Sequence, residues 1–326
     1  MKVSVFFPPV KNITGGMQVL LQVAGQIKAL GHGVRFYLWE NGHEALLRGR
    51  GFDVTVGKNA GLEPGEVFLV PEGWPNVLHM GINSSARCVV YCQNWAYLFS
   101  ALPEGVYWRD LPVEFVAVSQ PVAVFIENVL AVKPMIVRPC INDSVFFPAS
   151  KPDDVINIAY MPRKNRALYK QIRHIFESRN RGRFNVIWKG IDGLELEKVA
   201  DNLRKSHIFL ATGFPEGCPL PPLEAMACRC MVVGFAGFGG WDYMRQSDDG
   251  YTPQIPLRMV QWQGNGYFSA DGDVLDAALN LEKAVSRLSA GDESLGLILE
   301  NSLACASHYS NQSQQDEVLA WINSLQ

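Results

Sequence analysis

The sequence predicts an α/β protein with two Rossmann-like domains, each organised around a parallel β-sheet. Strand–helix–strand units occur in both halves of the chain, and repeats of this kind build parallel sheets. These units are found at residues 2–7, 17–30 and 34–39, and again at 156–161, 167–179 and 184–190. The chain has 326 residues, of which 48% are hydrophobic, and this is enough for about two domain cores.

In the first half, apolar and β-branched runs predict further strands at 67–71, 87–92 and 115–119. The sequence Thr14-Gly15-Gly16 stands directly before the helix expected at 17–30. Thr14 suits the N-cap position, and the two glycines let a ligand come close to the helix N-terminus, which binds anions. The alternative is a turn that needs glycine only for a positive φ.

The second half repeats the pattern. We expect a helix and a strand within 196–213, a strand and a helix start within 264–285, and an amphipathic helix at 314–325. The polar, proline-containing segment ASKPDDVIN indicates a linker. We therefore place the domains at 1–150 and 151–326, and interpret residues 245–263, which fit no pattern, as an insertion.

The most informative stretch is residues 216–233, EGCPLPPLEAMACRCMVV. Glu216 follows the apolar run HIFLA and is therefore expected at the carboxyl end of a strand, where open α/β sheets bind ligands. Glu224 is expected in the first turn of a helix, because Pro221 and Pro222 stand where a helix begins. Carboxylates in such places accept hydrogen bonds from ribose or sugar diols. The alternative is a solvated loop residue and a helix-capping carboxylate.

A basic cluster, formed by Arg163, Lys164 and Arg166, stands between the strand at 156–161 and the helix at 167–179. Unpaired cations are disfavoured at a helix N-terminus because the helix dipole is positive there, and a bound anion would remove the conflict. The sequence therefore favours an anion site in this loop. The alternative is a solvated basic loop.

Composition limits the classes of partner and compartment. A net charge of −3 provides no basic excess for binding nucleic acid. The seven cysteines are odd in number and irregularly spaced, which argues against a disulfide framework and for a reducing, cytoplasmic compartment. The segment MKVSVFFPPV is too short an apolar run for a signal peptide, and no run approaches the roughly 20 residues that span a bilayer. None of these observations excludes contact with a membrane surface.

The stretch at 216–233 resembles the signature of the retaining glycosyltransferases of glycosyltransferase family 4, and weaker similarity covers most of the chain. That signature pairs two glutamates at this spacing, followed by an Ala-Met-Ala helix and a strand. The resemblance implies the GT-B fold, in which two Rossmann-like domains with parallel sheets face each other across a cleft and the last helix, about 314–325, packs back on the N-terminal, acceptor-side domain. Pro219 departs from the signature, because the family usually has Gly there and its N–H often faces the donor sugar.

The resemblance also implies roles for individual residues. Arg163 and Lys164 would bind the donor diphosphate and stabilise its growing charge, so that no metal is required. Glu216 would act at the donor sugar, and Glu224 would hold the ribose hydroxyls. Further contacts with the nucleotide-sugar are expected at five positions, namely Gly15, Gly16, Gly217, Cys218 and Leu220.

Two more polar residues stand near positions that related enzymes use. Gln93 follows the strand at 87–92, so it either reaches a sugar or holds its own loop. Asp242, in the run GFGGWDYM, takes the place of the glutamate in the family's Gly-Gly-x-x-Glu loop.

We therefore expect an enzyme that transfers a sugar from a nucleotide-sugar to an unknown acceptor, either a glycan, a lipid-linked molecule or a small molecule. Transfer is expected to retain the anomeric configuration and to need no cofactor. The alternative is a catalytically silent GT-B scaffold that binds a nucleotide-sugar without turnover, to which Pro219 and the short basic loop point. A sugar-nucleotide epimerase would need a different carboxylate and histidine set, and a phosphorylase would need a lysine for pyridoxal phosphate that the sequence does not mark.

Overall fold

The structure is a computed structural model that describes residues 1–57 and 61–325. The chain divides into two compact units. Unit 1 comprises Met1–Cys140 together with Asn311–Gln326, and unit 2 comprises Ile141–Ser310. The chain therefore leaves unit 1, forms unit 2 as one continuous segment, and then returns to unit 1.

The division between the units falls earlier than the position near 150 that the sequence indicated. Ile141, Val145 and Phe146 are buried in a core cluster of unit 2, and these contacts assign their segment to that unit. The two places where the chain passes between units are tied together inside unit 2. There the Ile141 N–H donates a hydrogen bond to the Tyr309 carbonyl oxygen over 2.8 Å.

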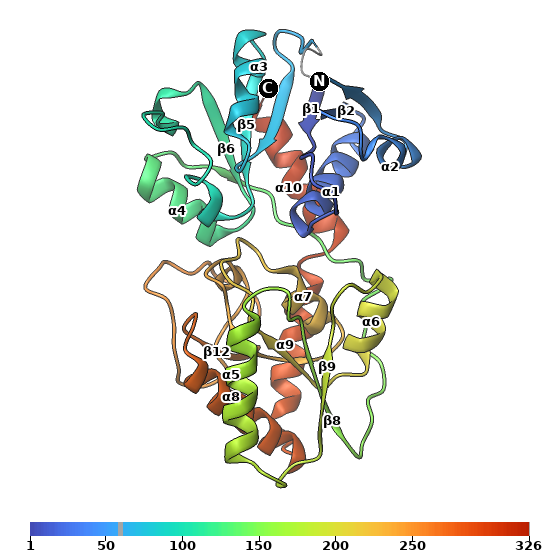
Figure 1. The fold of residues 1–326 in the computed structure, drawn as a ribbon, viewed down its shortest axis with the longest axis vertical. Coiled ribbons are helices and arrows are strands. Elements are labelled where there is room, and N and C mark those ends of the chain that lie inside the picture. Colours follow the sequence, from blue (N-terminus) through green and yellow to red (C-terminus); the bar gives the residue numbers. More distant parts are fainter. Residues whose placement is uncertain (58–60, 326) are drawn as a thin grey trace. The chain divides into compact units, whose positions relative to one another are not determined.

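Unit 1 contains a seven-stranded, wholly parallel sheet (Figure 1). Its strands are β1 (Lys2–Phe6), β2 (Gly33–Leu38), β3 (Asp53–Val56), β4 (Val67–Pro71), β5 (Arg87–Cys92), β6 (Val113–Ala117) and β7 (Met135–Ile136). They lie in the order β3-β2-β1-β4-β5-β6-β7. The order reverses between β1 and β4, so the topological switch point of this sheet lies there.

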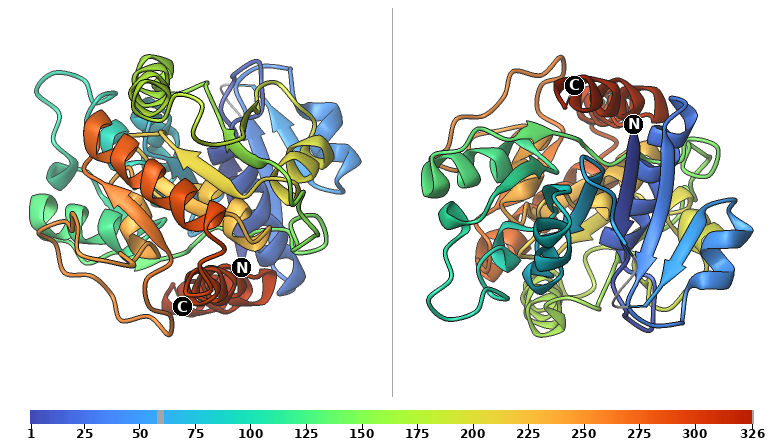
Figure 2. Two further views of the ribbon diagram at one scale, coloured as in Figure 1. Left: turned by 90° about the horizontal axis from the view of Figure 1, so that it is seen from below. Right: turned by 90° about the horizontal axis from the view of Figure 1, so that it is seen from above.

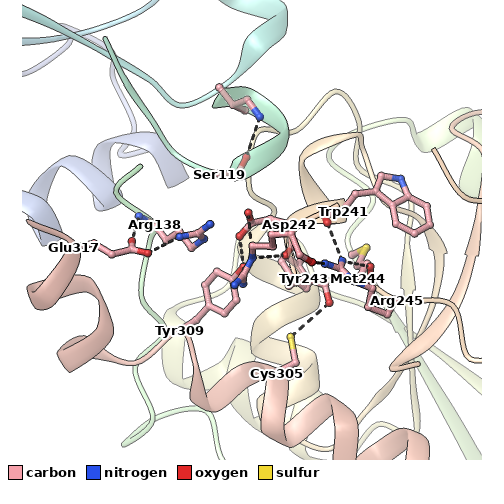
Figure 3. A network of polar contacts seen from close by, with 12 residues as sticks. Ser119, Arg138, Trp241, Asp242, Tyr243, Met244, Arg245, Cys305, Tyr309 and Glu317 are labelled. Atoms are coloured by element: carbon pink, nitrogen blue, oxygen red, sulfur yellow. Dashed lines mark hydrogen bonds and ion pairs between the residues drawn. The ribbon is translucent and has the colours of Figure 1, made fainter. Parts of the chain in front are cut away.

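The helices of unit 1 include one from the end of the chain. They are α1 (Gly15–Ala29), α2 (Glu44–Gly49), α3 (Leu78–Asn83), α4 (Gln120–Leu130) and α10 (Asn311–Ser324). Helices α1 and α10 pack against each other (Figure 1), and the Gln26 amide donates to Asn311 Oδ1 over 2.7 Å. The Arg138 N–H donates to Glu317 on α10 over 2.7 Å, and Figure 3 includes this pair.

Unit 2 contains a five-stranded parallel sheet. Its strands are β8 (Ile156–Tyr160), β9 (Val186–Gly190), β10 (Ile208–Ala211), β11 (Met231–Phe235) and β12 (Gly266–Ser269), in the order β12-β11-β10-β8-β9. Successive side chains of β10 enter two different core clusters, one on each face, as the period of two in a strand requires. The switch point of this sheet lies between β8 and β10.

Helices cover both faces of this sheet. They are α5 (Arg166–Arg179), α6 (Leu196–Arg204), α7 (Leu220–Ala227), α8 (Val274–Ser289) and α9 (Leu295–Ser307). Helices α5 and α8 lie side by side on one face (Figure 2), and α6 and α7 lie on the other. Short 3₁₀ turns occur at η1 (Pro75–Val77), η2 (Trp95–Tyr97), η3 (Trp108–Asp110) and η4 (Gly239–Asp242).

The strands predicted from apolar runs all form, with ends that differ from the prediction by at most two residues. The sequence reasoning overlooked β3, α2, α3, α4 and α9. In the part of the chain that the structure describes, every cysteine is a free thiol. None of the described helices combines the length and the apolar character that crossing a membrane requires.

Candidate functional site

A pocket opens at the switch point of unit 2, at the carboxyl ends of β8 and β10. Open α/β sheets bind their ligands at such points, because the loops after neighbouring strands diverge there and leave a crevice. The lining residues are Met161, Arg163, Lys164, Phe209, Leu210, Ala211, Thr212, Gly213, Glu216, Pro219, Pro221, Pro222 and Phe235. The basic loop and the first glutamate of the 216–233 stretch, which are far apart in sequence, therefore meet in one pocket.

The basic loop is held against the loop that follows β10. Asn165, which adopts the left-handed conformation with φ of 54°, precedes α5. Its side-chain amide donates to the carbonyl oxygens of Thr212 and Phe214, both over 3.0 Å. These bonds fix the end of the loop and place Lys164 beside the β10 loop.

Lys164 and Glu216 form an ion pair in this pocket. Lys164 Nζ lies 2.7 Å from Glu216 Oε1, and the two side chains are 29% and 24% exposed. Arg163 lines the same pocket, is exposed, and has no ion-pair partner among the described residues. Arg166 is not a lining residue and instead pairs with Asp192 at 3.4 Å on the surface. Of the three cations in the predicted cluster, two thus face the pocket.

The backbone of Glu216 is fixed by a glycine-rich loop after β11. The Glu216 N–H donates to Gly237 O, and the Gly239 N–H donates to Glu216 O, each over 3.0 Å. Between these glycines Phe238 has φ of 65° and ψ of −60°, and the Gly239 N–H also donates to Gly237 O over 2.9 Å. This is the strained form of the γ-turn, and such strain clusters at functional sites. The sequence reasoning overlooked this support, although its three glycines were a signal.

Helix α7 begins earlier than the sequence indicated. Its first residue is Leu220 and its N-cap is Pro219, so Glu224 is the fifth helical residue and does not lie in the first turn. Of the four N–H groups that a helix leaves unbonded at its start, three are missing here, because Pro219, Pro221 and Pro222 have none. Leu220 alone supplies such a donor, so the start of α7 is a poor anion site.

Glu224 is partly buried and is not among the residues that line the pocket. Its carboxylate has no hydrogen-bond partner among the described residues. Burial raises its pKa from the ordinary value of 4.5 to about 7. The surrounding protein therefore disfavours the charged form of this carboxylate, and no hydrogen bond from the described residues offsets the effect.

This raised pKa predicts a pH dependence of stability. Between pH values of about 4.5 and 7 the folded protein holds a proton at Glu224 that the unfolded chain has released, so stability falls as the pH rises through this window. Glu224→Gln should remove this loss. The free energy of unfolding of the variant minus that of the original protein should be larger by about 1–3 kcal/mol at about pH 8 than at about pH 5.

Thermal or urea unfolding at both pH values measures this difference. Glu197→Gln, a change at an exposed position of α6, is the matched control and should show no such trend. A difference for Glu224→Gln that stays constant or shrinks as the pH rises would contradict the prediction.

Three residues expected to contact the nucleotide-sugar lie beside the pocket and not in its lining. Gly217 is buried, and Cys218 and Leu220 pack against a core cluster of unit 2. Their backbone precedes or opens α7. A donor contact by these three residues stays a prediction.

Asp242 does not take the place of a ligand-binding glutamate. It is fully buried, accepts a hydrogen bond from the Tyr309 hydroxyl (Figure 3), and lies 3.5 Å from Arg258 Nε. Arg258 belongs to the segment 245–263 and also donates to the Asp242 carbonyl oxygen over 2.8 Å. This aspartate therefore anchors that segment to the core of unit 2.

In unit 1, Gly15 and Gly16 lie at the start of α1, and the predicted N-cap is confirmed because the Thr14 hydroxyl accepts from the Met17 N–H. Neither glycine has a positive φ, so the alternative explanation for them is wrong. A Cβ on Gly16 would lie 2.7 Å from Gln93 Oε1, whereas Gly15 has open space around it. Gly16 therefore makes room for the Gln93 side chain.

The sequence reasoning overlooked Glu72, a buried carboxylate just beyond β4. It accepts hydrogen bonds from the N–H groups of Gln93 and Asn94 over 3.0 and 2.9 Å, and burial raises its pKa to about 7. Glu72 thus holds the loop that carries Gln93. No local pattern marked it, because its partners lie about twenty residues away in the sequence.

Comparisons with known proteins add to this picture. The chain matches no family model. It is 28% identical over 231 residues to the alpha-1,6-glucosyltransferase of Actinobacillus pleuropneumoniae serotype 7 (strain AP76), and the match covers 69% of this chain and 70% of that protein.

Two solved structures resemble the whole chain. The glycosyltransferase from Rickettsia africae ESF-5 has a TM-score of 0.68 at 12% identity, with 99% of this chain and 98% of that chain covered. The pneumococcal O-GlcNAc transferase GtfA, solved in complex with UDP and GlcNAc, has a TM-score of 0.64 at 11% identity, with 100% and 98% covered. The chain therefore has the GT-B fold of these glycosyltransferases, as its sequence predicted.

Proposed function

We propose that this chain is a retaining glycosyltransferase that moves a sugar from a nucleotide-sugar to an acceptor hydroxyl. The observation that carries the proposal is the meeting of Arg163, Lys164 and Glu216 in one pocket at the switch point of unit 2. The similar protein from Actinobacillus pleuropneumoniae is called a glucosyltransferase, and this supports a hexosyl donor. The pneumococcal relative binds UDP and GlcNAc, which supports a nucleoside diphosphate as the leaving group.

In the proposed reaction, the bond between the anomeric carbon and the donor diphosphate breaks, and a bond to the acceptor oxygen forms. The acceptor proton leaves with the diphosphate. Arg163 and Lys164 stabilise the charge that grows on the diphosphate, and preorganised cations act most strongly where charge develops. Glu216 faces the positive character at the anomeric carbon, and Glu224 accepts hydrogen bonds from the ribose hydroxyls.

A thermal-shift screen over UDP, ADP, GDP, dTDP and their sugars tests the proposal. A ligand at about 100 times its dissociation constant should stabilise the protein by about 2.7 kcal/mol. The nucleotide-sugar that stabilises the protein is then offered with candidate acceptors, and release of the nucleoside diphosphate is measured. Absence of stabilisation by every member of the panel would contradict the proposed function.

The second candidate is a nucleotide-sugar-binding scaffold without turnover. The start of α7 favours it, because the prolines at 219, 221 and 222 remove backbone donors from the wall of the pocket. Binding of a nucleotide-sugar, with no release of nucleoside diphosphate across a broad panel of acceptors, would favour this candidate over the enzyme.

We further propose that the reaction needs no metal, because two cations face the site of the expected diphosphate. Transfer should therefore continue in EDTA at an unchanged rate. The control adds Mg²⁺ or Mn²⁺ after the chelator. Loss of transfer in EDTA that either ion restores would contradict this prediction.

A further inference from the structure

We infer that Glu216 has a second role, as the counter-ion of Lys164, and that a nucleoside diphosphate binds by drawing Lys164 away from this carboxylate. The inference rests on the proposed function. It means that the ion pair keeps Glu216 neutralised until the donor has bound. In the protein without donor, the pair is neutral. Once the diphosphate holds Lys164, the charge of Glu216 is left uncompensated beside the sugar.

The structure holds this pair in place on both sides. Lys164 Nζ contacts Glu216 Oε1 at 2.7 Å and the Pro215 carbonyl oxygen at 3.3 Å. Asn165 anchors the loop of the lysine, and the γ-turn after β11 anchors the backbone of the glutamate. The backbone on each side of the pair is thus held by a separate set of hydrogen bonds.

Gly213 leaves room for the pair. A Cβ at this position would lie 3.3 Å from Glu216 Oε1 and 3.9 Å from Lys164 Cδ. Both charged groups line the pocket and are about a quarter exposed, so a ligand in the pocket can reach them. The contact therefore forms at the surface of the pocket and can be replaced by a stronger anion.

A bound diphosphate has few other partners within unit 2. Helix α7 offers the single N–H of Leu220 at its start, because prolines occupy the neighbouring positions. Arg163 is exposed and has no ion-pair partner among the described residues, so it suits the first contact with an incoming anion. Lys164 is the next cation in the pocket, and its present partner is Glu216.

The consequence for the reaction is an ordered exchange of partners. The carboxylate of Glu216 is masked until the diphosphate of the donor has arrived, and it then faces the anomeric carbon as a free charge. Glu216 thereby lowers the affinity for the diphosphate while it raises the rate of transfer. If the role of Glu216 were purely structural, replacing it would not both strengthen the binding of diphosphate and slow the transfer.

Calorimetry and crystallography test the inference. UDP, ADP and GDP are titrated into the original protein, into Glu216→Gln and into the control Asp192→Asn, whose carboxylate pairs with Arg166 away from the pocket. We expect Glu216→Gln to bind the preferred diphosphate at least several-fold more tightly and Asp192→Asn to bind it unchanged. In a crystal structure of the complex, Lys164 Nζ should contact a phosphate oxygen and lie more than about 4 Å from Glu216.

The outcomes separate this inference from the proposed function. If none of the diphosphates binds the original protein, the proposed function fails, and the inference fails with it. If a diphosphate binds but Glu216→Gln leaves its affinity unchanged or weaker, the inference alone is overturned. The same holds if the Lys164–Glu216 contact persists in the complex.

Discussion

Glu216→Gln is expected to lower kcat for sugar transfer by about tenfold or more, without weakening the binding of nucleoside diphosphate. Glutamine keeps the size and the hydrogen-bonding groups of glutamate but lacks its charge. The carboxylate faces the pocket from a loop that the γ-turn at Phe238 fixes. Its charge should matter most when positive character develops at the anomeric carbon, and this occurs only in the transition state.

The matched control is Glu224→Gln, in which the same atoms change eight positions further along the chain. Glu224 would hold the ribose in the ground state and the transition state alike, so its loss should chiefly raise the donor KM. Steady-state kinetics with an identified acceptor distinguishes the two. If Glu216→Gln is correctly folded and turns over at the original rate, Glu216 is only a loop residue and our assignment of roles is wrong.

The double variant Arg163→Ala, Lys164→Ala is expected to bind nucleoside diphosphate about a hundredfold more weakly. Hydrogen bonds to charged groups contribute roughly 1.5–3 kcal/mol each, and a loss of about 3 kcal/mol corresponds to this factor. Both side chains line the pocket at the switch point, and α7 supplies little to replace them.

Isothermal titration calorimetry measures the loss, and Arg166→Ala is the control. Arg166 is the first residue of α5, two positions after Lys164, but it pairs with Asp192 and does not line the pocket. Its removal should leave the affinity nearly unchanged. Original affinity in the double variant would remove both residues from the site.

The sequence indicated the strands well because their signal is local. Val67–Pro71 is buried along its whole length, and a run of apolar residues with this composition has few other stable conformations. The four-residue strand Asp53–Val56 was overlooked, since it is too short and too polar at its start to show a period. The early start of α7 was also missed, because a proline is tolerated in the first helical turn at more than one position.

Part of the candidate site could also be predicted from the sequence, but this prediction depends on sheet geometry and not on a local signal. The carboxyl ends of parallel strands lie at one edge of a sheet. Because β8 and β10 are adjacent, Lys164 after β8 and Glu216 after β10 must lie close together in such a sheet. That they form an ion pair, and that Asp242 is buried against Tyr309, depends on side-chain packing between distant segments. No spacing within a single stretch of sequence encodes such contacts.

The path of the chain has a consequence for how the protein is made. Unit 2 is one continuous segment and can begin to fold as soon as residue 310 has left the ribosome, since domains generally fold as units during synthesis. Unit 1 begins first but is completed last, because Val318, Trp321 and Ile322 of α10 are buried and α10 packs against α1. Until that helix is synthesised, the apolar surface it covers stays open to solvent, so the N-terminal segment of unit 1 depends on a helix that is translated only after the whole of unit 2.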